Sequence, residues 1–364
     1  MMNDTRHDIR RQDIRVTVDD LERFMGEVLR RAGADEASSA AVTRALVTAS
    51  RMGTDSHGLR LLPHYIRALE GGRIKGAPKM RFTRRLPATG IFDADNGFGH
   101  LAGYAAMAHA VEMAEEIGVG AVAVGHSSHF GAAGCYALAA AERGLIGLSF
   151  CNSDPFVLLH EGLSPFHGTN PIAFAAPVEG QSPYLLDMAT SAVPWNRVQQ
   201  YGAIGRELPD QVAADARGHV TRVPAEVAAL LPLGGSDFGF KGAGLGGMVE
   251  VLSSTLSGML NGFRLLPMGG PDMSTPRGVG HFFLALNPAA FVDRATFAAC
   301  LAEYLADLRS QPAVDGGEVL APGDREWRCQ AQRDVEGIPL DSANQVAYAT
   351  LAESLDVPPL RYLT

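Results

Sequence analysis

The chain is poor in cysteine, and its cysteines are not spaced as metal ligands. The four are Cys135, Cys151, Cys300 and Cys329. None forms a CxxC pair, so the sequence predicts neither a zinc knuckle nor a disulfide framework. Unpaired cysteines are typical of a reducing compartment, and a cytoplasmic protein is therefore expected.

A basic excess and a membrane-spanning apolar run are also missing. The chain holds 31 lysines and arginines against 40 aspartates and glutamates, which gives a formal net charge of -9. Because no surplus of cations is available to neutralise phosphates, a nucleic-acid partner is not expected. The polar and charged start, residues 1–15, is unlike a signal peptide. With no apolar run long enough to cross a bilayer, no membrane association is expected either.

A G-x-S-x-G motif is absent, so the chain carries no signal for a serine hydrolase. The residues it has in abundance are glycine and proline, 41 and 21 of them, interleaved with apolar runs. That mixture indicates many turns and close backbone approaches rather than disorder. At 364 residues, the chain is long enough for two or three domains and a large core.

Helical and strand-like patterns alternate along the chain and predict an α/β protein. Residues 1–12 are expected to be a frayed tail, and residues 17–52 a helical hairpin. An apolar strand at 119–124 is followed by a helix at 132–143 and a strand at 146–151. A strand–helix–strand connection of this length favours a parallel pair.

The loop between this strand and this helix, residues 125–131 (GHSSHFG), concentrates groups that do chemistry. It lies where the carboxyl end of a strand meets a helix, the usual place of reactive side chains in α/β proteins. Imidazole is the side chain best matched to proton transfer near neutral pH, so catalysis by one histidine is favoured. His126 and His129 could instead bind a metal with Asp154 or Asp187 as third ligand. The two serines could equally close the loop on its own backbone.

Ser56 and His57 form a second candidate pair, at the end of the second predicted helix. They could transfer protons together. A histidine at this place is also favoured simply because its charge meets the helix dipole. Arg60 follows closely, and its planar guanidinium matches a carboxylate, so it is the predicted anchor of a substrate carboxylate.

Two further candidates, Asp187 and Ser153, lie at the ends of predicted strands. The carboxylate of Asp187 could orient an imidazole or hold a ribose hydroxyl. Asp187 could also be a helix N-cap. Ser153 could contact a phosphate or a ribose, or simply close a turn.

A glycine-rich stretch at 234–247 is expected to lead into a helix at 248–260, and residues 242–247 (GAGLGG) match G-x-G-x-x-G. No convincing strand precedes this match, and no acidic residue follows at the spacing of a dinucleotide-binding fold. We therefore reject a Rossmann fingerprint. A glycine-rich helix start could still cradle a phosphate with Lys241 as its cation, or serve close packing beside a solvated lysine.

Six short stretches resemble, in their order, the malate/L-lactate dehydrogenase-like family of NAD(P)-dependent oxidoreductases. They are TDSHG at 54–58, SSHFG at 127–131, GTNP at 168–171, DMATS at 187–191, FKG at 240–242 and PGD at 322–324. Each is a weak signal alone, but six in order are specific for the family. That family includes ureidoglycolate and sulfolactate dehydrogenases and Δ1-piperideine-2-carboxylate reductases.

The resemblance implies an α/β fold that binds NAD(P) without a Rossmann domain. It implies a helical N-terminal domain, residues 1–75, which packs with a C-terminal helix within residues 335–364. Residues 76–145 would form an α/β domain with the catalytic loop. Residues 146–334 would form a cofactor-binding α/β domain that returns to the second domain. A homodimer with its active site between domains is also implied.

The resemblance also implies roles for individual residues. His129 is the implied proton acceptor and donor, and Ser56 and His57 are the substrate-side pair. Asp187 completes a relay in the imine reductases. The positions implied to hold the cofactor are Ser153, Asp187, Met188, Ala189, Lys241 and Gly323.

The expected reaction is hydride transfer between NAD(P)H and C2 of a small 2-oxo, 2-imino or 2-hydroxy acid. His129 or His57 would move the proton. Residues 194–206 and 262–280 depart from the family's pattern, and this bears on substrate identity more than on reaction type. The sequence is compatible with NAD and with NADP, and with a carbonyl and with an imine as the acceptor.

Two alternatives assign the chain a different class of function. One is a metal-dependent hydrolase or lyase built on His126, His129 and Asp187. The other is a member of the family that binds a ligand without catalysis. The main hypothesis needs no metal, because a histidine can polarise the carbonyl itself.

Overall fold

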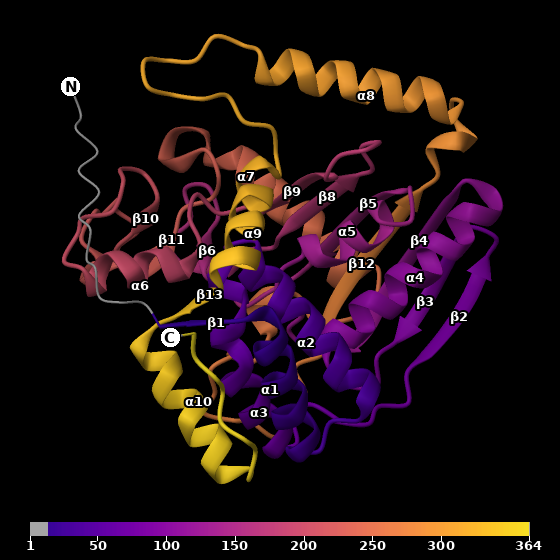
Figure 1. Ribbon diagram of the computed structural model, residues 1–364. Coiled ribbons are helices and arrows are strands. Elements are labelled where there is room, and N and C mark those ends of the chain that lie inside the picture. Colours follow the sequence, from indigo (N-terminus) through magenta and orange to yellow (C-terminus); the bar gives the residue numbers. More distant parts are fainter. Residues whose placement is uncertain (1–13, 364) are drawn as a thin grey trace.

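The computed structural model describes residues 14–363, so the predicted tail at 1–12 lies outside the described residues (Figure 1). The fold is a mixed α/β fold around a seven-stranded sheet. In spatial order the strands are β2 (Arg81–Leu86), β3 (Thr89–Asp93), β4 (Val119–Ser127), β12 (Val279–Leu286), β5 (Ile146–Cys151), β8 (Ile172–Ala176) and β9 (Tyr184–Met188). β3 and β4 run parallel, and the other neighbouring pairs of this sheet are antiparallel.

Strand β12 separates two strands that the sequence predicts to be neighbours. Both β4 and β5 pair with β12 in antiparallel register, so that Phe283 lies opposite Val122 on one side and Ser149 on the other. The predicted parallel pair is therefore wrong, although β4 and β5 run in the same direction. The inserted strand comes from much further along the chain, and its buried Phe283 and Ala285 fill the middle of the core.

Helices α4 (Gly99–Ile117) and α5 (Gly134–Ala141) pack on the sheet, α4 against β4 and α5 against β5. Fully buried alanines recur along α4 at a four-residue spacing. They are Ala102, Ala106, Ala110 and Ala114. This spacing places them on one side of the helix, where their small side chains let the backbone approach the strand closely.

The N-terminal helices and the C-terminal end of the chain share one apolar core. The elements are β1 (Ile14–Val16), α1 (Val18–Arg31), α2 (Glu36–Arg51), η1 (Asp55–His57), η2 (Leu59–Leu61), α3 (Leu62–Glu70), β13 (Ile338–Leu340) and α10 (Ser342–Ser354). The predicted hairpin is present as α1 and α2, capped by the side chains of Thr17 and Asp35. β1 pairs with β13, and Tyr348 of α10 stacks on Phe24 with ring centroids 5.2 Å apart.

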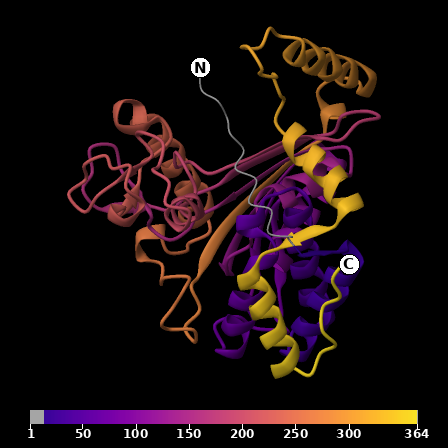
Figure 2. The same ribbon diagram turned by 60° about the vertical axis from the view of Figure 1, so that its left-hand side comes forward.

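A lobe with a second, four-stranded sheet stands opposite these helices, on the left of Figure 2. Its elements are β6 (Val157–Leu158), β7 (Pro165–His167), α6 (Trp195–Ala203), β10 (Ala213–Ala214), η3 (Pro224–Glu226), β11 (Ala229–Leu230), α7 (Gly235–Glu250), η4 (Val251–Thr255) and η5 (Gly262–Arg264). The glycine-rich stretch lies inside α7, not before the helix as predicted. A Cβ on Gly242 would run into the backbone of Leu233, so glycine lets the helix lie against the segment that precedes it.

The chain returns from the lobe through η6 (Pro288–Ala290), α8 (Arg294–Arg309) and α9 (Asp324–Glu336). α8 lies at the outer edge of the molecule (Figure 1). Of its residues, Leu305 is buried, and it packs with Val178 and Ala321. Within residues 14–363, no helix combines the length and the apolarity needed to cross a membrane.

Candidate active site

A cavity of about 440 Å³ is walled by the N-terminal helices, the loop after β4, the end of β9 and the start of α6. Predicted site residues from distant parts of the sequence meet in its wall. They are Ser56, His57, His129, Ser153, Asp187 and Ala189. The fold therefore gathers most of the predicted site residues around one space.

His129 follows β4 on a loop that is fixed at both neighbouring residues. The buried hydroxyl of Ser128 accepts a hydrogen bond from the amide of Gly99 at 2.9 Å. On the other side, Phe130 is buried, with its ring parallel to that of His281 at 4.6 Å between centroids. Because both neighbours are anchored, the imidazole between them is held in place at the cavity wall.

Tyr65 of α3 is the hydrogen-bond partner of His129. Its hydroxyl oxygen lies 2.6 Å from Nδ1. Tyr65 is fully buried, and burial raises the pKa of its hydroxyl well above the usual range. The protonated phenol can donate to Nδ1 or accept from it. In both cases Nε2 of His129 is left for a ligand in the cavity.

The second imidazole, that of His57, lies beside the first. The two rings stack with centroids 5.8 Å apart, and Nδ1 of His57 is 2.8 Å from the hydroxyl oxygen of Ser56. Burial, and then the charge of Arg60, lowers the pKa of His57 to about 4. Burial also lowers the pKa of His129 well below its usual range, with His57 adding to the effect. Both imidazoles are therefore neutral near pH 7 and able to accept a proton.

Asp187 lies within β9 rather than after it, and its carboxylate faces the cavity. Its Oδ2 accepts a hydrogen bond of 2.8 Å from the amide of Gly134, the first residue of α5. Burial raises the pKa of Asp187 to about 6, and the Gly134 amide opposes that rise. In the described part of the chain no imidazole is hydrogen-bonded to this carboxylate, so its place in a relay stays a prediction.

A network of polar side chains holds another corner of the cavity. The hydroxyls of Ser153 and Thr169 both line the wall, 3.3 Å apart. The Ser153 amide donates to the side chain of Asn170 at 3.1 Å, and Asn170 donates to Glu250 at 3.0 Å. Asn170 and Glu250 are buried, so these bonds fix the position of the two hydroxyls.

A buried ion pair, Asp154 with Arg277, stands next to the cavity. Asp154 also accepts from the amide of Met268 at 2.6 Å, and Arg277 donates to the carbonyl of Leu266 at 2.8 Å. Burial lowers the pKa of Arg277 to about 10. Sequence reasoning considered Asp154 only as a possible metal ligand. It missed Arg277 and Tyr65, because a loop arginine and a tyrosine at an apolar helix position carry no signal of their own.

Four predicted site residues lie outside the cavity wall. They are Arg60, Met188, Lys241 and Gly323. Arg60 and Lys241 are exposed, and the Lys241 ammonium lies 5.2 Å above the ring of Phe238. Lys241 lies well inside α7 rather than at its start, so it does not form the predicted phosphate cradle at a helix start. The contacts of these four residues with a cofactor or substrate stay predictions.

His126 lies apart from His129. Its side chain is 55% exposed, and its Nδ1 pairs with Asp93 at 3.1 Å. Across residues 14–363, no three histidine, cysteine, aspartate or glutamate side chains are arranged to hold a metal ion. The ligand set of the metal-dependent alternative, His126 with His129 and Asp187, is therefore not assembled in this fold.

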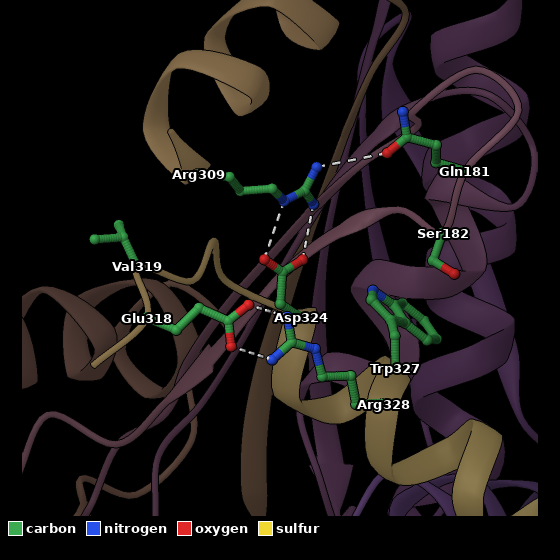
Figure 3. A pocket seen from close by; sticks show the side chains of 8 residues that line it. All are labelled: Gln181, Ser182, Arg309, Glu318, Val319, Asp324, Trp327 and Arg328. Carbon is green, nitrogen blue, oxygen red and sulfur yellow. Dashed lines mark hydrogen bonds and ion pairs between the residues drawn. The ribbon is translucent and has the colours of Figure 1, made fainter. Parts of the chain in front are cut away.

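A second cavity, of about 290 Å³, lies between α8 and α9 (Figure 3). Two arginines project into it, and each is already paired. Arg309 makes two hydrogen bonds to Asp324, at 2.7 and 3.0 Å, and Arg328 makes two to Glu318, at 2.5 and 2.6 Å. Because each guanidinium faces a carboxylate, the cavity has little net charge to offer a ligand.

In the wall of the main cavity, a neutral imidazole with a tyrosine partner lies beside a second imidazole, and a carboxylate lines the same wall. Such an arrangement is chemically able to transfer protons. Comparison with known proteins gives the family. A sequence model described as malate/L-lactate dehydrogenase matches residues 16–347, and the chain belongs to this family.

Relatives resemble this chain along nearly their whole length. A malate dehydrogenase of Pyrococcus abyssi is 36% identical, with 94% of this chain and 97% of the relative covered. A ureidoglycolate dehydrogenase (NAD(+)) of Escherichia coli O157:H7 is 33% identical, with coverages of 89% and 92%. The crystal structure of Δ1-piperideine-2-carboxylate reductase from Pseudomonas syringae superposes with a TM-score of 0.82 at 30% identity, covering 93% of this chain and 99% of that one.

Proposed function

We propose that this protein transfers a hydride between NAD(P)H and C2 of a small 2-oxo, 2-imino or 2-hydroxy acid, with His129 as proton acceptor and donor. Family membership supports the reaction class. One observation carries the choice of residue: Tyr65 engages Nδ1 of His129, while Nε2 is left for the substrate.

The proton step follows from the state of this imidazole. In the direction of oxidation, Nε2 of neutral His129 takes the proton from the substrate hydroxyl or amine. The pKa of His129, lowered by burial, keeps Nε2 unprotonated beforehand. In this step Tyr65 accepts from Nδ1–H, and the lone pair of the neutral imidazole is then on Nε2. A bound nicotinamide supplies or accepts the hydride at C2. In reduction, Nε2 of His129 returns the proton to the substrate.

His57 is proposed as the substrate-side partner. Its Nδ1 is tied to Ser56, and its ring stacks beside His129, so its Nε2 is available for a hydrogen bond to the substrate. Asp187 is proposed to supply the carboxylate that acts together with the two histidines. The Gly134 amide holds it in place, and it can either stabilise a protonated imidazole or bind a ribose hydroxyl.

The residues present fit a nicotinamide cofactor. The hydroxyls of Ser153 and Thr169 and the carboxylate of Asp187 suit ribose hydroxyls, and the small side chains at 131–134 leave a flat wall for a ring. Further proposed contacts are Met188, Ala189, Lys241 and Gly323. A sheet with one parallel pair of neighbours supports cofactor binding without a Rossmann domain, because that domain needs a run of parallel strands.

A homodimer is also proposed. The apolar side chains of Phe238, Phe240, Val251 and Leu256, on and just after α7, are each more than half exposed. An exposed apolar surface of this kind is typical of a protein–protein interface. Light scattering during size-exclusion chromatography should give twice the mass of one chain, and Val251→Asp should shift that mass toward one chain. A wild-type mass of one chain would contradict the dimer.

A direct assay tests the reaction. The protein is mixed with NADH or NADPH and a panel of 2-oxo acids, each with and without methylamine or ammonia. We expect loss of nicotinamide absorbance with at least one combination, and dependence on the amine would identify an imine as the acceptor. No loss of absorbance across the whole panel would contradict the proposed function.

A further inference from the structure

The wall of the main cavity near the two histidines is largely apolar. Phe156 and Trp195 stack there with ring centroids 5.3 Å apart. The side-chain amide of Asn196 reaches the carbonyl of Ser56 at 3.4 Å, which places the start of α6 next to the turn that carries His57. The aromatic pair therefore lies on the substrate side of the cavity.

Two aliphatic side chains extend this surface. Leu61 lines the cavity four residues after His57, and Met268 lines it from the loop before β12. Met268 is held there because its amide donates to Asp154, which precedes Phe156 by two residues.

Fixed positive charge is missing from the same wall. Of the described residues that line the cavity, none is a lysine or an arginine, whereas Asp154, Asp187 and Glu326 bring carboxylates. The buried guanidinium of Arg277 next to the cavity is bound to Asp154, and Arg60 is exposed outside the wall. A second carboxylate on a substrate would lose its hydration here without meeting a cation, which is costly.

We propose that the substrate is a monocarboxylic 2-oxo, 2-imino or 2-hydroxy acid with a branched aliphatic or aromatic side chain, selected by Leu61, Phe156, Trp195 and Met268. This inference rests on the proposed function and narrows its substrate class. The single carboxylate at C1 is received by neutral donors of the wall, Thr54, Ser56 and Asn196. Dicarboxylic acids such as malate are excluded by the apolar side chains and by the carboxylates around them.

A matched pair of substrates tests the selection on the wild-type protein. In 2-oxo-4-methylpentanoate, an isopropyl group replaces the second carboxylate of oxaloacetate at nearly the same size. With the better nicotinamide, we expect kcat/KM to favour the branched acid by at least about 100-fold. Equal or better use of oxaloacetate overturns this inference and leaves the proposed function standing. No turnover of any acid in the panel overturns the proposed function itself.

Substitutions in the cavity wall test which residues determine the preference between substrates. Leu61→Arg should raise kcat/KM for oxaloacetate relative to the branched acid by at least about 10-fold, because it supplies a counter-charge. The control Leu61→Met keeps the wall apolar and should leave the ratio nearly unchanged. Met268→Lys introduces a cation from a different segment of the chain and should change the ratio in the same direction. It can therefore replace Leu61→Arg in this test if that variant does not fold. If neither charged variant changes the ratio of kcat/KM between oxaloacetate and the branched acid, the proposal that these residues select the substrate is overturned.

Discussion

The hydroxyl oxygen of the fully buried Tyr65 lies 2.6 Å from Nδ1 of His129, which lines the cavity. One helix of the N-terminal core thus holds a hydrogen-bond partner against a histidine that follows strand β4 of the central sheet. The orientation of the His129 imidazole therefore depends on how these two parts of the fold pack together.

Tyr65→Phe should slow the reaction more than it weakens substrate binding. Removing one hydrogen bond to a group that becomes charged costs about 1.5–3 kcal/mol of transition-state stabilisation, or roughly 10- to 100-fold in kcat. KM should change little. The matched control is Tyr348→Phe, which removes a buried hydroxyl bound to the carbonyl of Leu59 at 2.7 Å. This control should lower stability without lowering kcat, and an equal loss of kcat in both variants would contradict the role of Tyr65.

His129→Ala should remove most of the activity. General acid–base catalysis contributes about 100- to 10,000-fold, so kcat/KM should fall within that range. His126→Ala makes the same change three residues earlier, at an exposed side chain outside the cavity. Its activity should stay close to that of the wild type. If His126→Ala were the more damaging change, the assignment of the proton-transferring residue would be wrong.

The fold should lose stability as pH falls from about 6.5 toward 3. Burial lowers the pKa values of His100 and His281 to about 3, from a usual value near 6.5. Across that window the unfolded chain binds more protons than the folded one, so stability falls with pH. Asp187 acts in the opposite sense between about 4 and 6, because its pKa is raised.

His100→Leu removes one of these titrating groups. Neither ring nitrogen of His100 has a hydrogen-bond partner among the described residues, so leucine breaks no such bond. The difference in urea midpoint between pH 7 and pH 5 should be smaller in this variant than in the wild type. An unchanged difference would show that His100 does not contribute to the acid sensitivity.

Asp154→Asn should destabilise the protein strongly, because it leaves the buried guanidinium of Arg277 without its counter-charge. Breaking a buried ion pair by removing one partner costs about 3–5 kcal/mol, measurable by denaturant unfolding. The double variant Asp154→Leu with Arg277→Met should recover much of that loss. Asp93→Asn, in the exposed pair with His126, is the control and should leave stability nearly unchanged.

Much of the fold could be predicted from local pattern. The hairpin of α1 and α2 follows from capping residues and helical spacing, and β4 and β5 follow from short apolar runs. The place of β12 could not be predicted, because pairing between distant strands leaves no local trace. The sequence pattern predicts the start of this helix too late in the chain, because glycines normally break a helix, whereas in α7 Gly242 allows close packing against Leu233.

The candidate site was predictable where a polar side chain follows a strand or a helix. His129, Ser56, His57 and Asp187 all stood out in this way, and all line the cavity. Tyr65 could not be found, since its position in α3 matches that of a core residue.

The position of β12 has a consequence for synthesis of the chain. β4 and β5, with the loop that carries His129, leave the ribosome long before residues 279–286 are made. Until then the central sheet has a missing middle strand and two open edges. Exposed strand edges are templates for pairing with other chains, and contacts between distant residues form slowly. A chain that stops before residue 279 should therefore aggregate rather than form a smaller active enzyme, although it contains both histidines of the site.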